Sequence, residues 1–216
     1  MISVFRNNKI FLVPFAAFLL FGTMFLIYNS KAETHLIINS YHNSFLDAIT
    51  PYLTWLGDGW AGVILIIILI FIKLRYAILT AIAFLLETLI TNLSRQTIFH
   101  GSPRPVSYFK GVHELHLVPG VSMNYWNSFP SGHTACAFAI YFCLSMMVKN
   151  NWLKFFFFFL ALLTAFTRVY LSQHFFMDVY GGSLVGVISA LVAYLIVLRI
   201  KKKWTEQPLQ TILKRS

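Results

Sequence analysis

Six runs of apolar residues dominate this chain, and each is close to the length that a helix needs to cross a lipid bilayer. A bilayer core of about 30 Å takes about 20 apolar residues in a helix. The runs lie near residues 10–28, 56–72, 76–93, 132–148, 153–170 and 178–198. The second is short unless it starts near Tyr52. We therefore expect an all-α polytopic membrane protein, a bundle of six transmembrane helices.

The composition agrees with this expectation. Only 11% of the 216 residues are charged and 58% are hydrophobic, whereas soluble domains carry about 25% charged residues. No linker, internal repeat or low-complexity boundary interrupts the chain. We expect a single domain over residues 1–216.

The basic residues indicate the orientation, because short loops rich in Lys and Arg stay in the cytoplasm. Twelve of the 17 fall on the side of the two termini: Arg6, Lys9, Lys73, Arg75, Lys149, Lys154, Arg199, Lys201, Lys202, Lys203, Lys214 and Arg215. Both termini are therefore expected in the cytoplasm. In a bacterium, the membrane that the chain crosses would be the inner membrane. The same distribution accounts for the net charge of +10, because basic residues on the cytoplasmic side set the topology and are attracted to the anionic lipids of the inner leaflet. No nucleic-acid partner is needed to explain it.

Two outer segments carry structure beyond simple connection. From Leu36 to Leu56, apolar residues recur at steps of three and four, the signature of an amphipathic helix. Such a helix would lie in the outer interface and guide a lipid, or would pack over the bundle. The second segment, from about Ser94 to Phe129, is long for a bundle loop, and loops of this size are usually functional or disordered.

Three short stretches in the second half of the chain read as parts of one phosphate site on the outer face. They are Arg104-Pro105, Pro130-Ser131-Gly132-His133, and Arg168 with His174 and Asp178. Arginine offers a planar fork of donors to phosphate oxygens. A serine-glycine pair that opens a helix adds hydroxyl and backbone donors where the helix dipole favours an anion. Taken alone, Ser131 could be an ordinary helix cap.

His174 and Asp178 have the spacing of a nucleophile and the carboxylate that orients it. If the last helix has begun by His174, the two share a helix face, and the carboxylate accepts a proton from one ring nitrogen while the other stays free for attack. A surface pair that caps a helix is the alternative. The neighbouring arginine motifs favour the functional interpretation.

These motifs resemble the membrane branch of the type 2 phosphatidic acid phosphatase (PAP2) superfamily. The second motif matches fully at Pro130 to His133, and the third matches at Arg168, His174 and Asp178, with Thr167 where serine is usual. The first motif departs, because the usual lysine position holds Thr97. Arg95, two residues earlier, would serve instead.

The resemblance implies phosphoryl transfer in two steps without a metal or another cofactor. His174 would attack phosphorus, Asp178 would orient it, and His133 would protonate the leaving oxygen. The phosphate oxygens would be held by a set of five residues: Arg95, Arg104, Ser131, Gly132 and Arg168. Water would then cleave the phosphohistidine.

Other candidates carry less weight. His113-Glu114-Leu115-His116 lacks the spacing of the helical zinc motif H-E-x-x-H, so contact with a lid or headgroup is favoured over metal binding. Glu87 lies inside a span, where a carboxylate is costly; supporting Arg95 and neutral burial are equally favoured. Cys136 and Cys143 are separated by about 10 Å of helix rise and cannot form a disulfide with each other.

We therefore expect a lipid phosphatase at the extracytoplasmic face. Undecaprenyl diphosphate is the first expected substrate, with phosphatidylglycerol phosphate and phosphatidic acid close behind, and removal of a lipid A phosphate is the alternative enzyme activity. A protein that binds or transports phospholipid without turnover is the alternative of another class.

Overall fold

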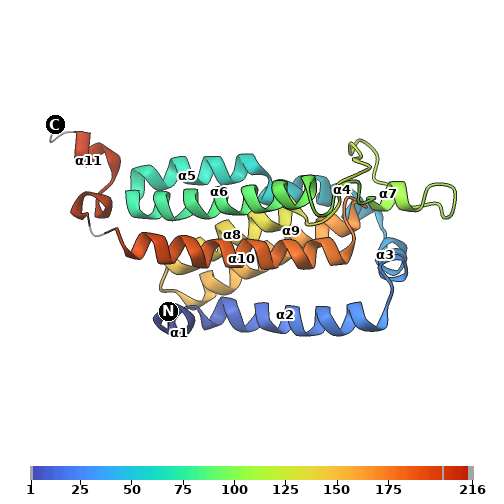
Figure 1. Cartoon of the computed structure of the whole chain (residues 1–216), viewed down its shortest axis with the longest axis horizontal. Helices are drawn as coiled ribbons and strands as arrows, with labels where there is room; N and C mark the ends of the chain where they lie inside the picture. The colour runs from blue at the N-terminus through green and yellow to red at the C-terminus, as the bar shows by residue number, and fades with distance from the viewer. Residues whose placement is uncertain (1, 201, 214–216) are drawn as a thin grey trace.

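The computed structural model describes residues 2–200 and 202–213, and the regular elements in these ranges are all helical. Its longer helices lie side by side in one bundle (Figure 1). They are α2 (Lys9–Tyr28), α5 (Gly59–Ile72), α6 (Leu74–Gln96), α8 (Gly132–Met147), α9 (Asn151–Tyr170) and α10 (Phe176–Leu198). Short helices lie at one end, α1 (Ile2–Asn7), η2 (Lys203–Glu206) and α11 (Leu209–Leu213), and at the other, α3 (Lys31–Ser40), α4 (Ser44–Leu53), η1 (Thr54–Gly57) and α7 (Pro105–Tyr108).

Several of these helices are suited to crossing a membrane. Four are long and apolar enough, namely α2, α6, α9 and α10, and a fifth span results if the bent pair 44–57 and 59–72 is counted as one. Helix α8 is apolar but only 16 residues long. The protein is therefore a multi-pass membrane protein. Each of the six apolar runs seen in the sequence contains or overlaps one long helix.

Helix α8 occupies the centre of the bundle, packed against α6, α9 and α10. Most of its side chains are buried, including Phe138 and Phe142. Helix α10 approaches it closely because Gly182 and Gly186 face its backbone. A Cβ at Gly182 would lie 2.5 Å from the Ser131 carbonyl oxygen, and one at Gly186 would lie 2.3 Å from that of Ala135. These glycines let the helices that carry the second and third motifs touch.

The single amphipathic helix expected from Leu36 to Leu56 is wrong. The chain forms two helices, α3 and α4, separated at residues 41–43, and continues as η1. Helix α4 has its own start, because the Asn43 side chain accepts a hydrogen bond from the Leu46 amide. After η1 the chain bends by 51° into α5.

Helix α3 packs over the outer end of the bundle, against α9 and α10. Its His35 is fully buried between the rings of Phe109 and Phe175. Burial lowers the pKa of His35 to about 4, so the ring is neutral at physiological pH. His35 Nε2 and the Asn39 amide both lie within hydrogen-bond reach of the Ser172 hydroxyl, 3.2 and 3.3 Å away.

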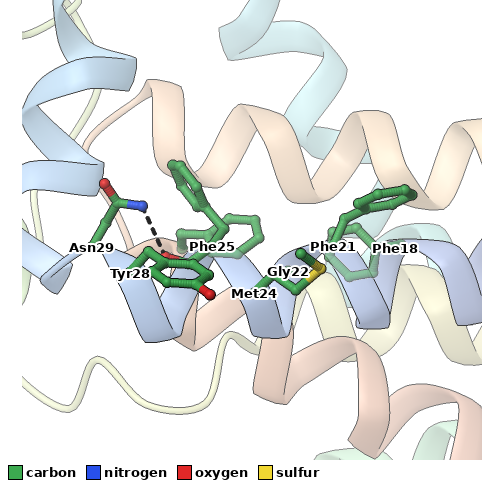
Figure 2. Close-up of a pocket in the computed structure, with 8 residues that line it drawn as sticks. Phe18, Phe21, Gly22, Met24, Phe25, Tyr28 and Asn29 are labelled. Carbon is green, nitrogen blue, oxygen red and sulfur yellow. Dashed lines mark hydrogen bonds between the residues drawn. The ribbon is translucent and has the colours of Figure 1, made fainter.

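Of the four helices that are long and apolar enough to cross a membrane, α2 is the least buried, and an apolar groove of about 520 Å³ lies along it. Figure 2 shows its lining, which includes Phe18, Phe21 and Phe25 together with Gly22 and Met24. In hydrocarbon, an apolar face of this kind needs no protein partner.

The end that carries α1 and α11 is rich in basic side chains. Arg75 donates to the carbonyl oxygens of Val197 and Ile200, and both Lys73 and Arg75 pair with Glu206. Lys201, Lys214 and Arg215 lie outside the described residues.

Candidate active site

Arg104 lies at the start of α7 and is held on both sides by backbone carbonyls. Its Nε donates to the Trp126 carbonyl at 3.1 Å and its Nη1 to the Gln173 carbonyl at 3.1 Å. Burial, and then the charge of Arg95, lower the pKa of Arg104 to about 10. The guanidinium therefore stays charged at neutral pH and is fixed in place before any ligand arrives.

Arg168 lies in the last turn of α9 and is buried. Its Nη1 donates to the Thr54 hydroxyl at 2.7 Å. Its Nε has no hydrogen-bond partner among the residues that the structure describes. Since a buried donor without a partner is costly, this N–H is suited to a phosphate oxygen.

Arg95 lies in the last turn of α6 beside the second motif. Its Nε and Nη2 donate to the Pro130 carbonyl at 3.0 and 2.7 Å, and a Cβ at Gly132 would lie 3.4 Å from its guanidinium. Thr97, by contrast, is exposed and its hydroxyl bonds back to Leu93 in its own helix. Of the two positions considered for the first motif, Arg95 and Thr97, it is Arg95 that contacts the second motif.

Ser131 is the N-cap of α8. Its hydroxyl oxygen accepts from the amide and the hydroxyl of Thr134, which leaves the hydroxyl hydrogen free to donate. Its own amide donates to the Asp178 carbonyl at 2.9 Å, so the start of α8 is tied to α10. Gly132 follows without a side chain, and the α8 N-terminus opens toward Arg95.

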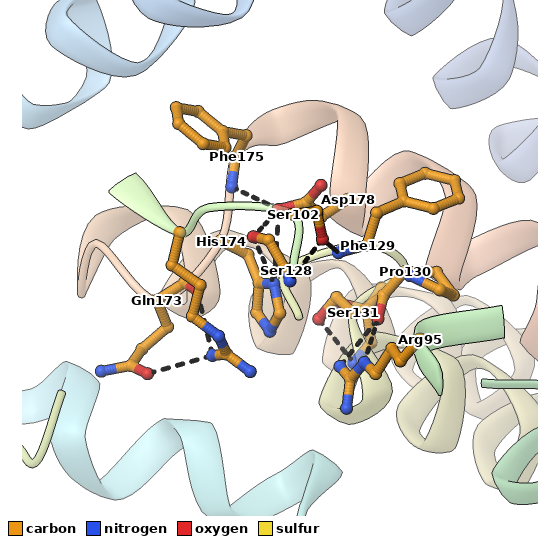
Figure 3. A network of polar contacts seen from close by, with 12 residues as sticks. Arg95, Ser102, Ser128, Phe129, Pro130, Ser131, Gln173, His174, Phe175 and Asp178 are labelled. Carbon is orange, nitrogen blue, oxygen red and sulfur yellow. Dashed lines mark hydrogen bonds and ion pairs between the residues drawn. The ribbon is translucent and has the colours of Figure 1, made fainter. Parts of the chain in front are cut away.

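His174 and Asp178 lie together in the buried centre of the site (Figure 3). His174 Nδ1 is 3.4 Å from Asp178 Oδ2, and the same oxygen accepts from the Phe175 amide at 2.9 Å and the Ser128 hydroxyl at 2.5 Å. The two do not share a helix face, because α10 begins at Phe176. Asp178 instead caps the start of α10, and in this position its carboxylate contacts His174, which lies two residues before the helix.

The protonation state of His174 suits a nucleophile. Burial lowers the pKa of His174 well below its usual value, and the charges of Arg104, Arg168 and Arg95 lower it further. The neutral ring keeps one lone pair. With Nδ1 beside the carboxylate, that lone pair lies on Nε2, the nitrogen free to attack.

His133 lies in the first turn of α8, with its Nε2 3.3 Å from Asp58 Oδ2. Both side chains are partly exposed and line an open cavity of about 720 Å³ that also reaches Arg168 and Gln173. Its other walls come from α4, η1 and the loop at 119–124. The cavity therefore opens beside His133 and Arg168, at the edge of the buried site.

Sequence reasoning missed four residues that shape the site: Thr54, Asp58, Ser128 and Gln173. Ser128 lies two residues before the Pro130 motif and Gln173 directly precedes His174, so proximity to a motif was their only signal. Thr54 and Asp58 come from the bend before α5, and no local pattern marks them.

The remaining candidates lie around the site or away from it. His116 pairs with Asp47 at 3.0 Å and stacks on His42, which fastens the outer loop to α4. Glu87 accepts from the Thr88 hydroxyl and lines a cavity of about 190 Å³ shared with Arg95 and His133. His100 and His113 are exposed, and Cys136 and Cys143 are buried free thiols. Within residues 2–200 and 202–213, no group of three or more His, Cys, Asp or Glu is placed to hold a metal ion.

Known proteins are similar to this chain in sequence and in fold. The sequence pattern of the PAP2 superfamily matches residues 73–202. The undecaprenyl-diphosphatase BcrC of Bacillus subtilis is 31% identical over 156 residues, which are 69% of this chain and 74% of BcrC.

Two solved structures are also similar. The crystal structure of Aquifex aeolicus LpxE matches with a TM-score of 0.67 and 28% identity, over 74% of this chain and 92% of LpxE. A transmembrane PAP2-type phosphatidylglycerolphosphate phosphatase from Bacillus subtilis matches with a TM-score of 0.63 over 92% of this chain and 99% of that one, and at 21% identity it supports the fold alone. The chain belongs to the PAP2 superfamily, and the resemblance in its motifs is confirmed. It is a membrane phosphatase of that family.

Proposed function

We propose that this protein removes a phosphate from a lipid diphosphate or phosphomonoester, through a phosphohistidine formed on His174. The observation that carries the proposal is the arrangement around that ring. A neutral, buried imidazole has one nitrogen held by Asp178, and the charged side chains of Arg95, Arg104 and Arg168 act on it from nearby. Fixed positive charges of this kind stabilise the charge that develops on a transferring phosphoryl group.

The reaction then follows in two balanced steps. His174 Nε2 forms a bond to phosphorus as the bond to the lipid oxygen breaks, and the His133 imidazolium gives its proton to that oxygen. In the second step a water oxygen attacks phosphorus, His133 takes the water proton, and the N–P bond breaks to release phosphate. No step needs a metal ion. Ser131, Gly132 and the three arginines hold the phosphate oxygens throughout.

Undecaprenyl diphosphate is the substrate that we place first. Its support is the 31% identity to the undecaprenyl-diphosphatase BcrC over most of both chains. A cavity of about 720 Å³ beside His133 and Arg168 also leaves room for a second phosphate. Phosphatidylglycerol phosphate and phosphatidic acid come next, and a lipid A phosphate is the alternative.

We further propose six transmembrane helices in one domain, with both termini in the cytoplasm and the site facing outward. Helix α8 would complete its crossing with the segments that flank it. Support comes from the opposite ends of the bundle: α1, α11 and the basic side chains around Arg75 lie at one end, and the site lies at the other. In a bacterium this orientation directs the site away from the cytoplasm across the inner membrane.

The test is phosphate release by the purified protein in detergent, from four substrates: undecaprenyl diphosphate, phosphatidylglycerol phosphate, phosphatidic acid and lipid A. We expect the first to have the highest kcat/KM, in the presence of a metal chelator. His174→Ala should abolish release and retain substrate binding, whereas His100→Ala, a matched change at an exposed histidine, should not alter turnover. Binding without release by the wild-type protein would favour the non-catalytic alternative, and loss of activity with chelator would contradict the metal-free reaction.

A further inference from the structure

The bend between α4 and α5 places two side chains in contact with motif residues. Across residues 54–58, the Thr54 hydroxyl accepts from Arg168 Nη1 at 2.7 Å, and the Asp58 carboxylate lies 3.3 Å from His133 Nε2. One short segment thus contacts both the second and the third motif. It belongs to neither, and it precedes the region that the PAP2 pattern matches.

The segment is held in position by close packing. A Cβ at Gly57 would lie 2.4 Å from the His133 carbonyl oxygen and 2.5 Å from Thr164 Cγ2, so only glycine fits there. The Tyr141 hydroxyl donates to the Leu56 carbonyl at 3.1 Å. The carboxylate of Asp58 is fixed as well, because its Oδ1 caps α5 by accepting from the Trp60 amide at 3.0 Å. Its other oxygen is the one that faces His133.

The contact between Asp58 and His133 matters because several charged groups act on the protonation of the His133 ring. The groups that act on its ring are Asp58 and the guanidinium groups of Arg168, Arg95 and Arg104, while Glu87 lines the small cavity behind it. The imidazole of His174 also lies within electrostatic range of it. A general acid has to carry a proton before it can give one away. Burial and three positive charges oppose a protonated ring, and the carboxylate of Asp58 acts against them at short range.

We propose that Asp58 is a positioning residue that orients His133 and stabilises its protonated form, which makes this histidine competent to protonate the leaving oxygen. The inference rests on the proposed function. Asp58 neither gains nor loses a proton in the cycle: the proton passes from His133 to the leaving oxygen in the first step, and from water to His133 in the second. Thr54 holds Arg168 from the same segment.

Two variants separate this role from helix capping. Asp58→Asn and Asp58→Ser both remove the charge and keep a side chain that caps a helix well. Glu33→Gln is the matched control, because Glu33 is another capping carboxylate at the same end of the bundle, exposed and without contact to the site.

The first readout is turnover of two substrates that differ in their leaving group. The leaving group of phosphatidic acid is a diacylglycerol alkoxide, which needs a proton, whereas that of p-nitrophenyl phosphate is a stable phenolate. Both Asp58 variants should lose about 10- to 100-fold in kcat on phosphatidic acid and at most about threefold on p-nitrophenyl phosphate. Glu33→Gln should match the wild type on both. Equal losses on the two substrates, or none, would overturn the assignment.

The second readout does not depend on activity. NMR of nitrogen-15-labelled histidine follows the titration of the His133 ring in detergent, assigned by the signal missing in His133→Gln. We expect the midpoint to move to lower pH in Asp58→Asn and to stay unchanged in Glu33→Gln. If the wild type hydrolysed no phosphate ester, the proposed function would fail and this titration alone would decide about Asp58; an unchanged midpoint in Asp58→Asn would refute the pairing.

Discussion

Replacing Gly186 with alanine should impair activity strongly, although the residue lies far from the chemistry. The new Cβ would lie 2.3 Å from the Ala135 carbonyl oxygen and 2.9 Å from the Ala139 amide nitrogen, where ordinary contacts begin at 3.4 Å. Both neighbours are backbone atoms of a central helix and cannot rotate away. Helices α8 and α10 must therefore separate locally by about 1 Å, the shortfall between these distances.

The consequence for catalysis follows from what the two helices carry. Helix α8 begins at the proposed phosphate-binding turn and bears His133, and α10 bears Asp178, which contacts His174. A misplacement of about 1 Å at a reacting centre costs about 100-fold in rate. Overpacking should also lower the free energy of unfolding by about 1–3 kcal/mol, while alanine gains back at most about 1 kcal/mol of helix propensity.

The assay is kcat for phosphate release together with the thermal unfolding midpoint in detergent. Gly59→Ala is the control, because its Cβ would meet only the Phe84 ring at 3.8 Å, an ordinary contact. We expect Gly186→Ala to remain folded with a lower midpoint and about 100-fold lower kcat, and Gly59→Ala to behave like the wild type. Wild-type kcat in Gly186→Ala would refute the idea that close contact of α8 and α10 sets the site geometry.

Two further predictions concern the site and its support. Asp178→Asn should lower kcat by about 10⁴-fold, or about 5 kcal/mol, since the amide removes the charge that fixes the His174 tautomer. Single-turnover kinetics would show this loss in the formation of the phosphohistidine. An unchanged rate of that step would contradict the role of Asp178. His35 is neutral in the folded protein down to a pKa of about 4, whereas an unfolded histidine takes up a proton near a pKa of about 6.5. The unfolded state thus binds more protons between these values, and the contribution of His35 to stability is lost as the pH falls, by about 2 kcal/mol between pH of about 7 and about 5. His35→Gln should remove this part of the acid sensitivity in thermal unfolding curves, and equal sensitivity in both proteins would disprove the assignment.

The sequence allowed prediction of the motif residues because each motif is local. Ser131 and His133 lie at the start of α8, and His174 and Asp178 lie on either side of the start of α10, so the spacing within each motif predicts that its residues are neighbours. Each of the six apolar runs coincides with, or lies within a few residues of, a helix of the bundle. The family resemblance followed from these short patterns.

Contacts between distant segments could not be predicted in this way. Thr54 and Arg168 are 114 positions apart, and Ser128 and Asp178 are 50 apart. Asp58 ahead of a glycine reads as a helix cap, which it also is, and its second contact depends on the bend that follows η1. At this bend Gly57 packs against the backbone of His133, which lies far away in the sequence.

The break in the outer segment escaped prediction for a different reason. Apolar residues continue at steps of three and four across positions 41–43, from Ile38 to Tyr41 and Phe45, so periodicity alone does not mark the break between α3 and α4. Only Asn43, with its side chain on the Leu46 amide, indicates a new start. The periodicity of apolar residues indicates which face of a helix is apolar, whereas a capping residue indicates where one helix ends and the next begins in a new direction.

The position of the reaction centre at one end of a tightly filled bundle has a consequence for lipid traffic. Beneath the site the interior is occupied by Phe11, Phe138, Phe142 and Phe158, and a charged headgroup has no place among these rings. On the proposed function, a lipid loses its phosphate and returns to the leaflet from which it was taken. Any passage of the shortened carrier to the opposite leaflet is then the work of a separate translocator, and the cell can control the two events independently.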